Sequence, residues 1–137
     1  MGIEENKEIV RQAFSLLSQR KVDTSFEFFA PEYIEHTTET DMSWEVTKQA
    51  VKEFQQAFTD GKVTFDLMVG EDDMVAVRET ITGTHTGEFG SVSPTGKQIK
   101  ICNNFIVKVA NGKIIEGWST FDSMSLMQQI GAIPSQK

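Results

Sequence analysis

Five side chains in this sequence have the chemistry needed to move protons or to bind a small molecule: His36, Arg78, His85, Trp118 and Asp122. Arg78 interrupts an apolar stretch. Trp118 and Asp122 lie four residues apart in an alternating segment, so we expect these two side chains to share one face of a strand. A carboxylate in an apolar pocket can act as a base because burial raises its pKa. Histidine or arginine can donate hydrogen bonds to negative charge that develops during such a transfer. These residue types favour acid–base chemistry.

The sequence offers little support for other kinds of site. The two histidines are far apart and Cys102 is the single cysteine, so no zinc or transition-metal spacing is present. No phosphate-binding glycine loop and no G-x-S-x-G motif occurs. We therefore expect neither a metal nor a cofactor.

Each of the five residues also has a purely structural explanation. Asp122 directly precedes a predicted helix, where its carboxylate could simply cap the first turn. Trp118 could fill the core or an interface, and Arg78 could pair with an acid on a neighbouring strand. His85 could be an exposed turn residue, and His36 could be structural at a helix exit. The residue pattern alone leaves both explanations open.

Helical periodicity dominates the first part of the chain. Apolar residues recur at spacings of three and four over residues 4–20, and again in a helix that begins at Ser43 and is followed by Gly61, a candidate C′ residue. Between these segments a short helix is predicted from Asp23, with Pro31 as its stop. The sequence therefore predicts three helices before any long strand.

From Val63 onward the period changes to two, which is typical of strands. Asn111-Gly112 predicts a type I′ hairpin, and Gly83 predicts a bulge or bend. An edge strand near residues 33–37 is an additional option. Helices followed by an antiparallel meander predict one α+β domain over residues 1–137. The long strands are predicted at residues 63–69, 74–86, 97–109 and 114–121, with a last helix at residues 123–130.

Composition narrows the classes of partner. The chain has 137 residues and a formal charge of −7, so its surface should repel nucleic acid, and it lacks a polybasic cluster for an anionic membrane. The acidic N-terminal residues, the absence of a long apolar run and the single cysteine predict a cytoplasmic protein.

Several motifs occur in a fixed order along the chain, and together they resemble the SnoaL-like polyketide (ester) cyclases of the nuclear transport factor 2-like superfamily. The resemblance covers roughly residues 6–132. The motifs are FAPEYIEH at 29–36, VAVR at 75–78, GTHTGEF at 83–89, PTGK at 94–97, NGKIIE at 111–116 and WSTFD at 118–122.

The resemblance implies a cone-shaped α+β barrel in which a curved antiparallel sheet wraps around the helices and leaves a deep pocket. In such cyclases an aspartate on the last strand acts as acid/base without metal or cofactor, and Asp122 matches that position. His36, Arg78, His85 and Trp118 match positions that often line the pocket, with His85 the second catalytic candidate and Tyr33 expected beside His36 at the rim. It also implies a homodimer formed through the sheet.

Two departures from the family pattern concern pocket polarity. Glu79 stands where many relatives carry an aromatic residue, and Gly117 stands where many carry a polar side chain.

The leading interpretation is a cofactor-independent cyclase-like lyase or isomerase that acts on a small, largely apolar carbonyl compound. The alternatives are a non-catalytic small-molecule binding protein and a dimeric interaction module.

Overall fold

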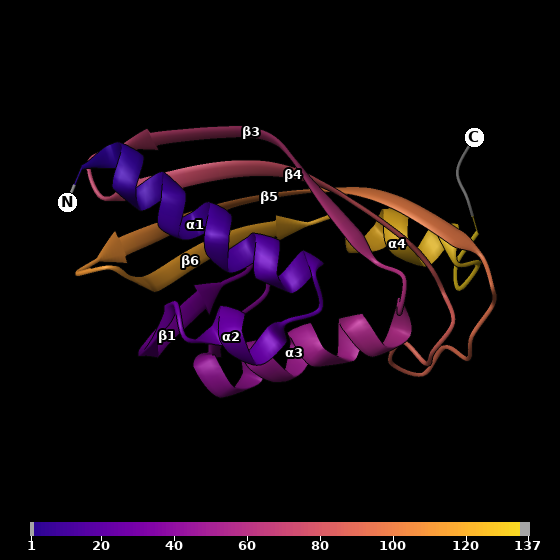
Figure 1. Cartoon of the computed structure of the whole chain (residues 1–137). Helices are drawn as coiled ribbons and strands as arrows, with labels where there is room; N and C mark the ends of the chain where they lie inside the picture. Colours follow the sequence, from indigo (N-terminus) through magenta and orange to yellow (C-terminus); the bar gives the residue numbers. More distant parts are fainter. Residues whose placement is uncertain (1, 135–137) are drawn as a thin grey trace.

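The computed structural model describes residues 2–134 as an α+β fold in which helices lie against the concave side of a curved, unclosed sheet (Figure 1). The predicted fold class is confirmed. In chain order the elements are α1 (Ile3–Ser18), α2 (Val22–Phe26), β1 (Phe29–His36), β2 (Asp41–Ser43), α3 (Trp44–Ala57), β3 (Lys62–Glu71), β4 (Met74–Thr84), β5 (Gln98–Ala110), β6 (Lys113–Phe121) and α4 (Ser123–Gln129).

The sheet has six strands in the order β2-β1-β6-β5-β4-β3. Strands β3 to β6 form the predicted antiparallel meander. Strand β1 adds to the edge of β6 in parallel, and β2 pairs antiparallel with β1. The sheet is therefore mixed, and the extra edge strand that the sequence offered as an option is present.

The first and third helices form where the apolar periodicity predicts them. The stripe of α1 buries Val10 and Ala13, and Ser43 caps α3 because its Oγ accepts from the Val46 N–H at 3.3 Å. The expected second helix is wrong at its end. It stops at Phe26, and Pro31 lies inside β1, where its missing N–H is tolerated near the sheet edge.

Gly83 does not form a bulge, since β4 pairs with β5 without interruption. Register shifts lie instead between Phe65 and Leu67 of β3, between Lys108 and Val109 of β5, and between Phe29 and Ile34 of β1. A side chain at position 83 would place its Cβ only 3.2 Å from the Phe58 Cβ at the end of α3. The glycine thus allows a close helix–sheet approach.

The predicted hairpin at Asn111-Gly112 is present, with both residues at positive φ. Across residues 2–134, the helices are all too short or too polar to span a bilayer.

Candidate active site

A cavity of about 680 Å³ lies between the concave sheet face and the helices α1, α2 and α3. Its wall is mainly apolar and rich in aromatic rings. Side chains from the helices and the sheet contribute Phe14, Phe26, Phe29, Tyr33, Trp44, Phe54, Phe58, Phe89, Phe105 and Phe121. Such a predominantly apolar hollow with a few polar groups is the usual form of a small-molecule site.

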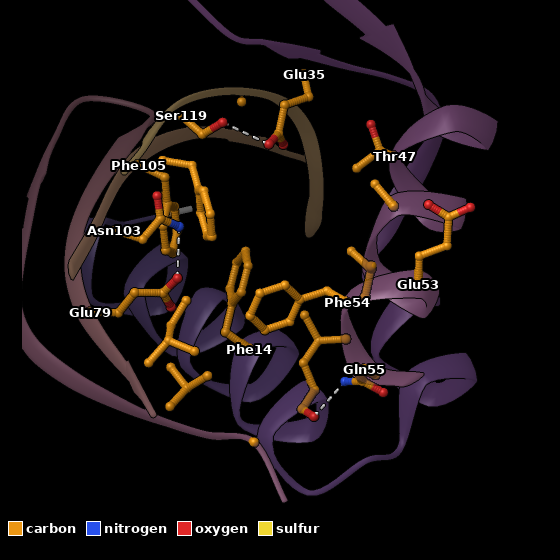
Figure 2. A pocket seen from close by; sticks show the side chains of 18 of the residues that line it. Phe14, Glu35, Thr47, Glu53, Phe54, Gln55, Glu79, Asn103, Phe105 and Ser119 are labelled. Atoms are coloured by element: carbon orange, nitrogen blue, oxygen red, sulfur yellow. Dashed lines mark hydrogen bonds between the residues drawn. The ribbon is translucent and has the colours of Figure 1, made fainter. Parts of the chain in front are cut away.

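Glu79 is the most buried acid of this cavity, with 6% of its surface exposed. It comes from β4, whose other inward side chains include Val77 and Ile81. Its Oε2 accepts a hydrogen bond from Asn103 Nδ2 at 2.8 Å, and Figure 2 shows this pair on the cavity wall. Burial raises the pKa of Glu79 to about 7, and the negative charges of Glu35 and Asp66 act in the same direction.

Asn103 can support Glu79 in both protonation states. It lies directly opposite Glu79 in the pairing of β4 with β5, and its Oδ1 is buried without a hydrogen-bond partner. The amide donates to the carboxylate as it stands, and rotation by half a turn would present Oδ1 to the protonated acid. This arrangement suits a group that both takes and returns a proton.

Glu35 is the second carboxylate facing this cavity, and it enters from β1. Tyr33 Oη donates to Glu35 Oε1 at 2.6 Å, and Ser119 Oγ donates to Oε2 at 2.9 Å (Figure 2). Burial raises the pKa of Tyr33 far above its ordinary value, so its hydroxyl stays protonated and remains a donor. Gly117 makes this contact possible, because a Cβ there would lie 2.1 Å from the Tyr33 hydroxyl oxygen.

Within residues 2–134 no group of three His, Cys, Asp or Glu side chains is placed to hold a metal ion.

The sequence-predicted site residues do not form one cluster. Tyr33 lines the cavity as a buried wall residue and not at a rim, whereas Trp118 borders both this cavity and a groove on the outer face of the sheet. The cavity wall does not include Arg78, His85 or Asp122, so the expected sharing of one cavity by these residues is wrong.

Asp122 lies just beyond β6, after Phe121, whose ring faces the cavity. Its side chain is exposed, and Oδ1 accepts from the Ser125 N–H at 3.0 Å at the start of α4. Asp122 therefore caps the first turn of α4, as the structural explanation predicts. The role of Asp122 as a general base stays a prediction, since a capping hydrogen bond does not test catalysis.

His85 is fully buried beside the loop that links β4 to β5. Its Nδ1 accepts from the Thr95 N–H at 3.2 Å, and its ring packs on Phe58 with centroids 5.5 Å apart. The histidine was expected either in the pocket or exposed in a turn, and it instead anchors the loop from within.

Arg78, His36 and Trp118 line a groove of about 540 Å³ over the outer face of the sheet. Arg78 faces outward because strand neighbours alternate and Glu79 faces inward. His36 stacks on Trp118 and contacts both Asp41 at 2.7 Å and Glu116 at 2.6 Å. The hydrogen bond to Asp41 is the main cause that raises the pKa of His36, and the hydrogen bond to Glu116 raises it further.

The capping geometry predicts how Asp122 variants behave. Asp122→Ala should lower the free energy of unfolding by about 1 kcal/mol, while Asp122→Asn should change it by only a few tenths, because asparagine caps about as well. Chemical denaturation of both variants measures this. Equal losses in the two variants would contradict the capping role.

The chain is similar to one family of known proteins over most of its length. A family model described as SnoaL-like polyketide cyclase matches residues 7–130. A search of curated proteins finds no match.

Solved structures share the fold at low sequence identity. AclR of Streptomyces galilaeus, described as a candidate hydroxylase, is 22% identical with a TM-score of 0.93, covering 99% of this chain and 87% of its own. A candidate SnoaL-like polyketide cyclase from Jannaschia is 22% identical with a TM-score of 0.85, covering 96% and 95%. IdmH of Streptomyces antibioticus, a candidate polyketide cyclase, is 25% identical with a TM-score of 0.80, covering 92% and 98%.

Proposed function

Because the chain belongs to the SnoaL-like polyketide cyclase family, we propose that it is a cofactor-independent acid–base enzyme of the cyclase or isomerase type. Its substrate is a small, largely apolar carbonyl compound held in the aromatic cavity. The family makes this general type of reaction the natural expectation, and the cavity of this chain suggests which group performs it.

The observation that carries the proposal is the environment of Glu79. A general base works best when its pKa lies near the operating pH, and burial in this cavity raises the pKa of Glu79 to about 7. The carboxyl has a dedicated partner in Asn103 and an oxygen, Oε1, with no hydrogen-bond partner among the described residues. We therefore assign the role of base to Glu79 in place of Asp122.

The proposed reaction is a proton transfer that needs no other reagent. The Glu79 carboxylate removes a proton from a carbon flanked by carbonyl groups, and the electron pair of that C–H bond becomes the enolate. The enolate carbon then attacks a second carbonyl of the same molecule, and the protonated Glu79 returns its proton to the resulting alkoxide. Reprotonation of the enolate at another carbon gives the isomerase outcome with the same residues.

A screen of β-dicarbonyl and polyketide-like compounds, run on the wild type, Glu79→Gln and Asp122→Asn, tests the proposal. The wild type and Asp122→Asn should turn over the same compound, whereas Glu79→Gln should not. Loss of turnover in Asp122→Asn alone would return the role of base to Asp122. Binding without turnover by the wild type would favour the non-catalytic binding protein.

We also propose that two copies associate through the outer face of the sheet. Leu67, Val69 and Ile106 are 64%, 63% and 41% exposed there, close to the groove that holds Arg78. Exposed apolar side chains on a sheet face are covered by a second copy when the same patch meets itself about a two-fold axis.

Light scattering at about 20 µM, on the order of usual assay concentrations, should therefore give the mass of a dimer. The double variant Leu67→Lys/Ile106→Lys should give a monomer that keeps its circular dichroism spectrum. A monomeric wild type would contradict this assembly.

A further inference from the structure

Two carboxylates enter the same aromatic cavity from different strands, Glu35 from β1 and Glu79 from β4 (Figure 2). Both side chains line this space, and burial and the negative charge of Glu35 both raise the pKa of Glu79. Placing two acids of like charge beside one apolar space is unfavourable unless something compensates them.

The described side chains do not supply that compensation. None of the ion pairs found within residues 2–134 includes Glu35 or Glu79. Arg20 and Lys62 also line the cavity. The Arg20 Nη1 and Nη2 donate to the carbonyls of Phe58 and Gln55 at 3.2 and 2.6 Å, and Lys62 is exposed at the start of β3. The acids thus face the cavity without a cationic partner from this part of the chain.

The polar atoms that remain available are acceptors. Each oxygen of Glu35 accepts one hydrogen bond from Tyr33 or Ser119 and keeps a further lone pair. Glu79, more than nine-tenths buried, presents Oε1 without a hydrogen-bond partner among the described residues. A ligand that fits this pattern must bring donors, and a positive charge would relieve the repulsion between the acids.

The surrounding rings suit a cation as well. The rings of Phe14 and Phe105 lie 4.6 Å apart by centroid, and those of Phe54 and Phe58 lie 4.8 Å apart, all in the cavity wall. The faces of aromatic rings attract ammonium groups, and this attraction grows when water is excluded.

We propose that the ligand of this cavity carries a protonated amine, which lies between Glu35 and Glu79 while its apolar part packs against the phenylalanine rings. The three N–H donors of a primary ammonium match carboxylate oxygens that have open lone pairs. A neutral ligand of the same shape leaves the two acids uncompensated, and an anionic one adds a third negative charge.

This inference rests on the proposed function only in taking the cavity as the substrate site, and it narrows the substrate to an amine-bearing carbonyl compound. An ammonium group close to the reacting carbon also stabilises the negative charge of the enolate. The substrate would then supply the cation that the acidic end of the cavity lacks.

The test compares three probes that share one aromatic part and differ in charge: naphthylethylammonium, naphthylethanol and naphthylacetate. Binding is followed by calorimetry at about pH 8 and about pH 5.5. The wild type should bind the ammonium at least about tenfold more tightly than the alcohol at the higher pH, and should bind the acetate weakest. The preference should shrink at the lower pH because Glu79, which shares the cavity with Glu35 and Glu53 and is also influenced by the charge of Asp66, becomes protonated.

Variants locate the effect. Glu35→Gln and Glu79→Gln should each reduce the ammonium preference several-fold, by about 3-fold or more, and the double variant should abolish it without weakening the alcohol. Glu71→Gln removes an equal charge from an exposed position of β3 and should leave the preference intact.

Equal affinity for the ammonium and the alcohol in the wild type would overturn the inference, as would a preference that survives the double variant. Neither result would touch the role of Glu79 as a base, which is measured by turnover and by its own titration. Conversely, a preference that depends on Glu35 and Glu79 would stand even in a protein that turned nothing over.

Discussion

Glu79→Gln should lower turnover by about 10²–10⁴-fold, the usual contribution of a positioned general base. Glutamine keeps the size of the side chain and can still accept from Asn103, so the cavity should keep its shape. Wild-type kcat/KM should rise with pH and level off above about 7, because only the ionised carboxylate takes a proton and burial raises the pKa of Glu79 in the free enzyme to about 7.

Matched variants separate this effect from a general loss of charge. Glu71→Gln makes the same chemical change at an exposed position of β3 and should leave kcat within about twofold, as expected for a surface substitution. A Glu79→Gln protein with wild-type turnover, or a wild-type profile that is flat between about pH 5 and pH 9, would remove Glu79 from the mechanism.

The same substitution should make the protein more stable at alkaline pH. The pKa of Glu79 is raised from 4.5 in the unfolded chain to about 7 in the folded protein, so folding disfavours the charged form. Below about pH 4.5 the acid is protonated in both states and costs nothing. Between about pH 4.5 and pH 7 the wild type loses stability, and above pH 7 the loss is constant at about 3 kcal/mol.

Chemical denaturation at one protein concentration measures this directly. The free energy of unfolding of Glu79→Gln should equal that of the wild type near pH 4 and exceed it by about 3 kcal/mol near pH 8, because glutamine cannot ionise. Glu71→Gln should show no such pH-dependent difference. A constant difference between Glu79→Gln and the wild type across this range would mean that burial does not raise the pKa of Glu79.

Most elements of the fold were predictable because their signals are local. The change of period at Val63, the Ser43 cap and the Asn111-Gly112 turn each depend on neighbours in the sequence, and each is present. The strand that contains Pro31 could not be derived in the same way. It forms by pairing with β6, more than 80 residues further along the chain, and this tertiary contact overrides the helical pattern around Phe26.

The candidate site was less predictable than the fold, because the residue that stands out in the sequence of β4, Arg78, lies on the outer face of the sheet, whereas the cavity lies on the other face. Arg78 drew attention as a charge among apolar residues, yet the alternation that buries Val75 and Val77 buries Glu79 and exposes Arg78. A charged residue at an inward position was the available signal for Glu79. No comparable signal joins Glu35 to Ser119, because their contact depends on the parallel pairing of β1 with β6.

Asp122 illustrates the limit of strand parity. Trp118 and Asp122 were expected on one face, but β6 ends at Phe121 and the chain turns into α4, so the parity of the strand no longer orients Asp122. The residue that follows a strand can therefore serve the next helix instead of the sheet.

The ionisation of Glu79 inside the cavity is the central claim, and the side-chain carboxyl ¹³C shift tests it without any substrate. The Glu79 signal is assigned as the one missing from Glu79→Gln and is followed from about pH 3 to pH 9. The structure predicts a midpoint at about 7. A midpoint near the ordinary glutamate value of about 4.3 would contradict the claim.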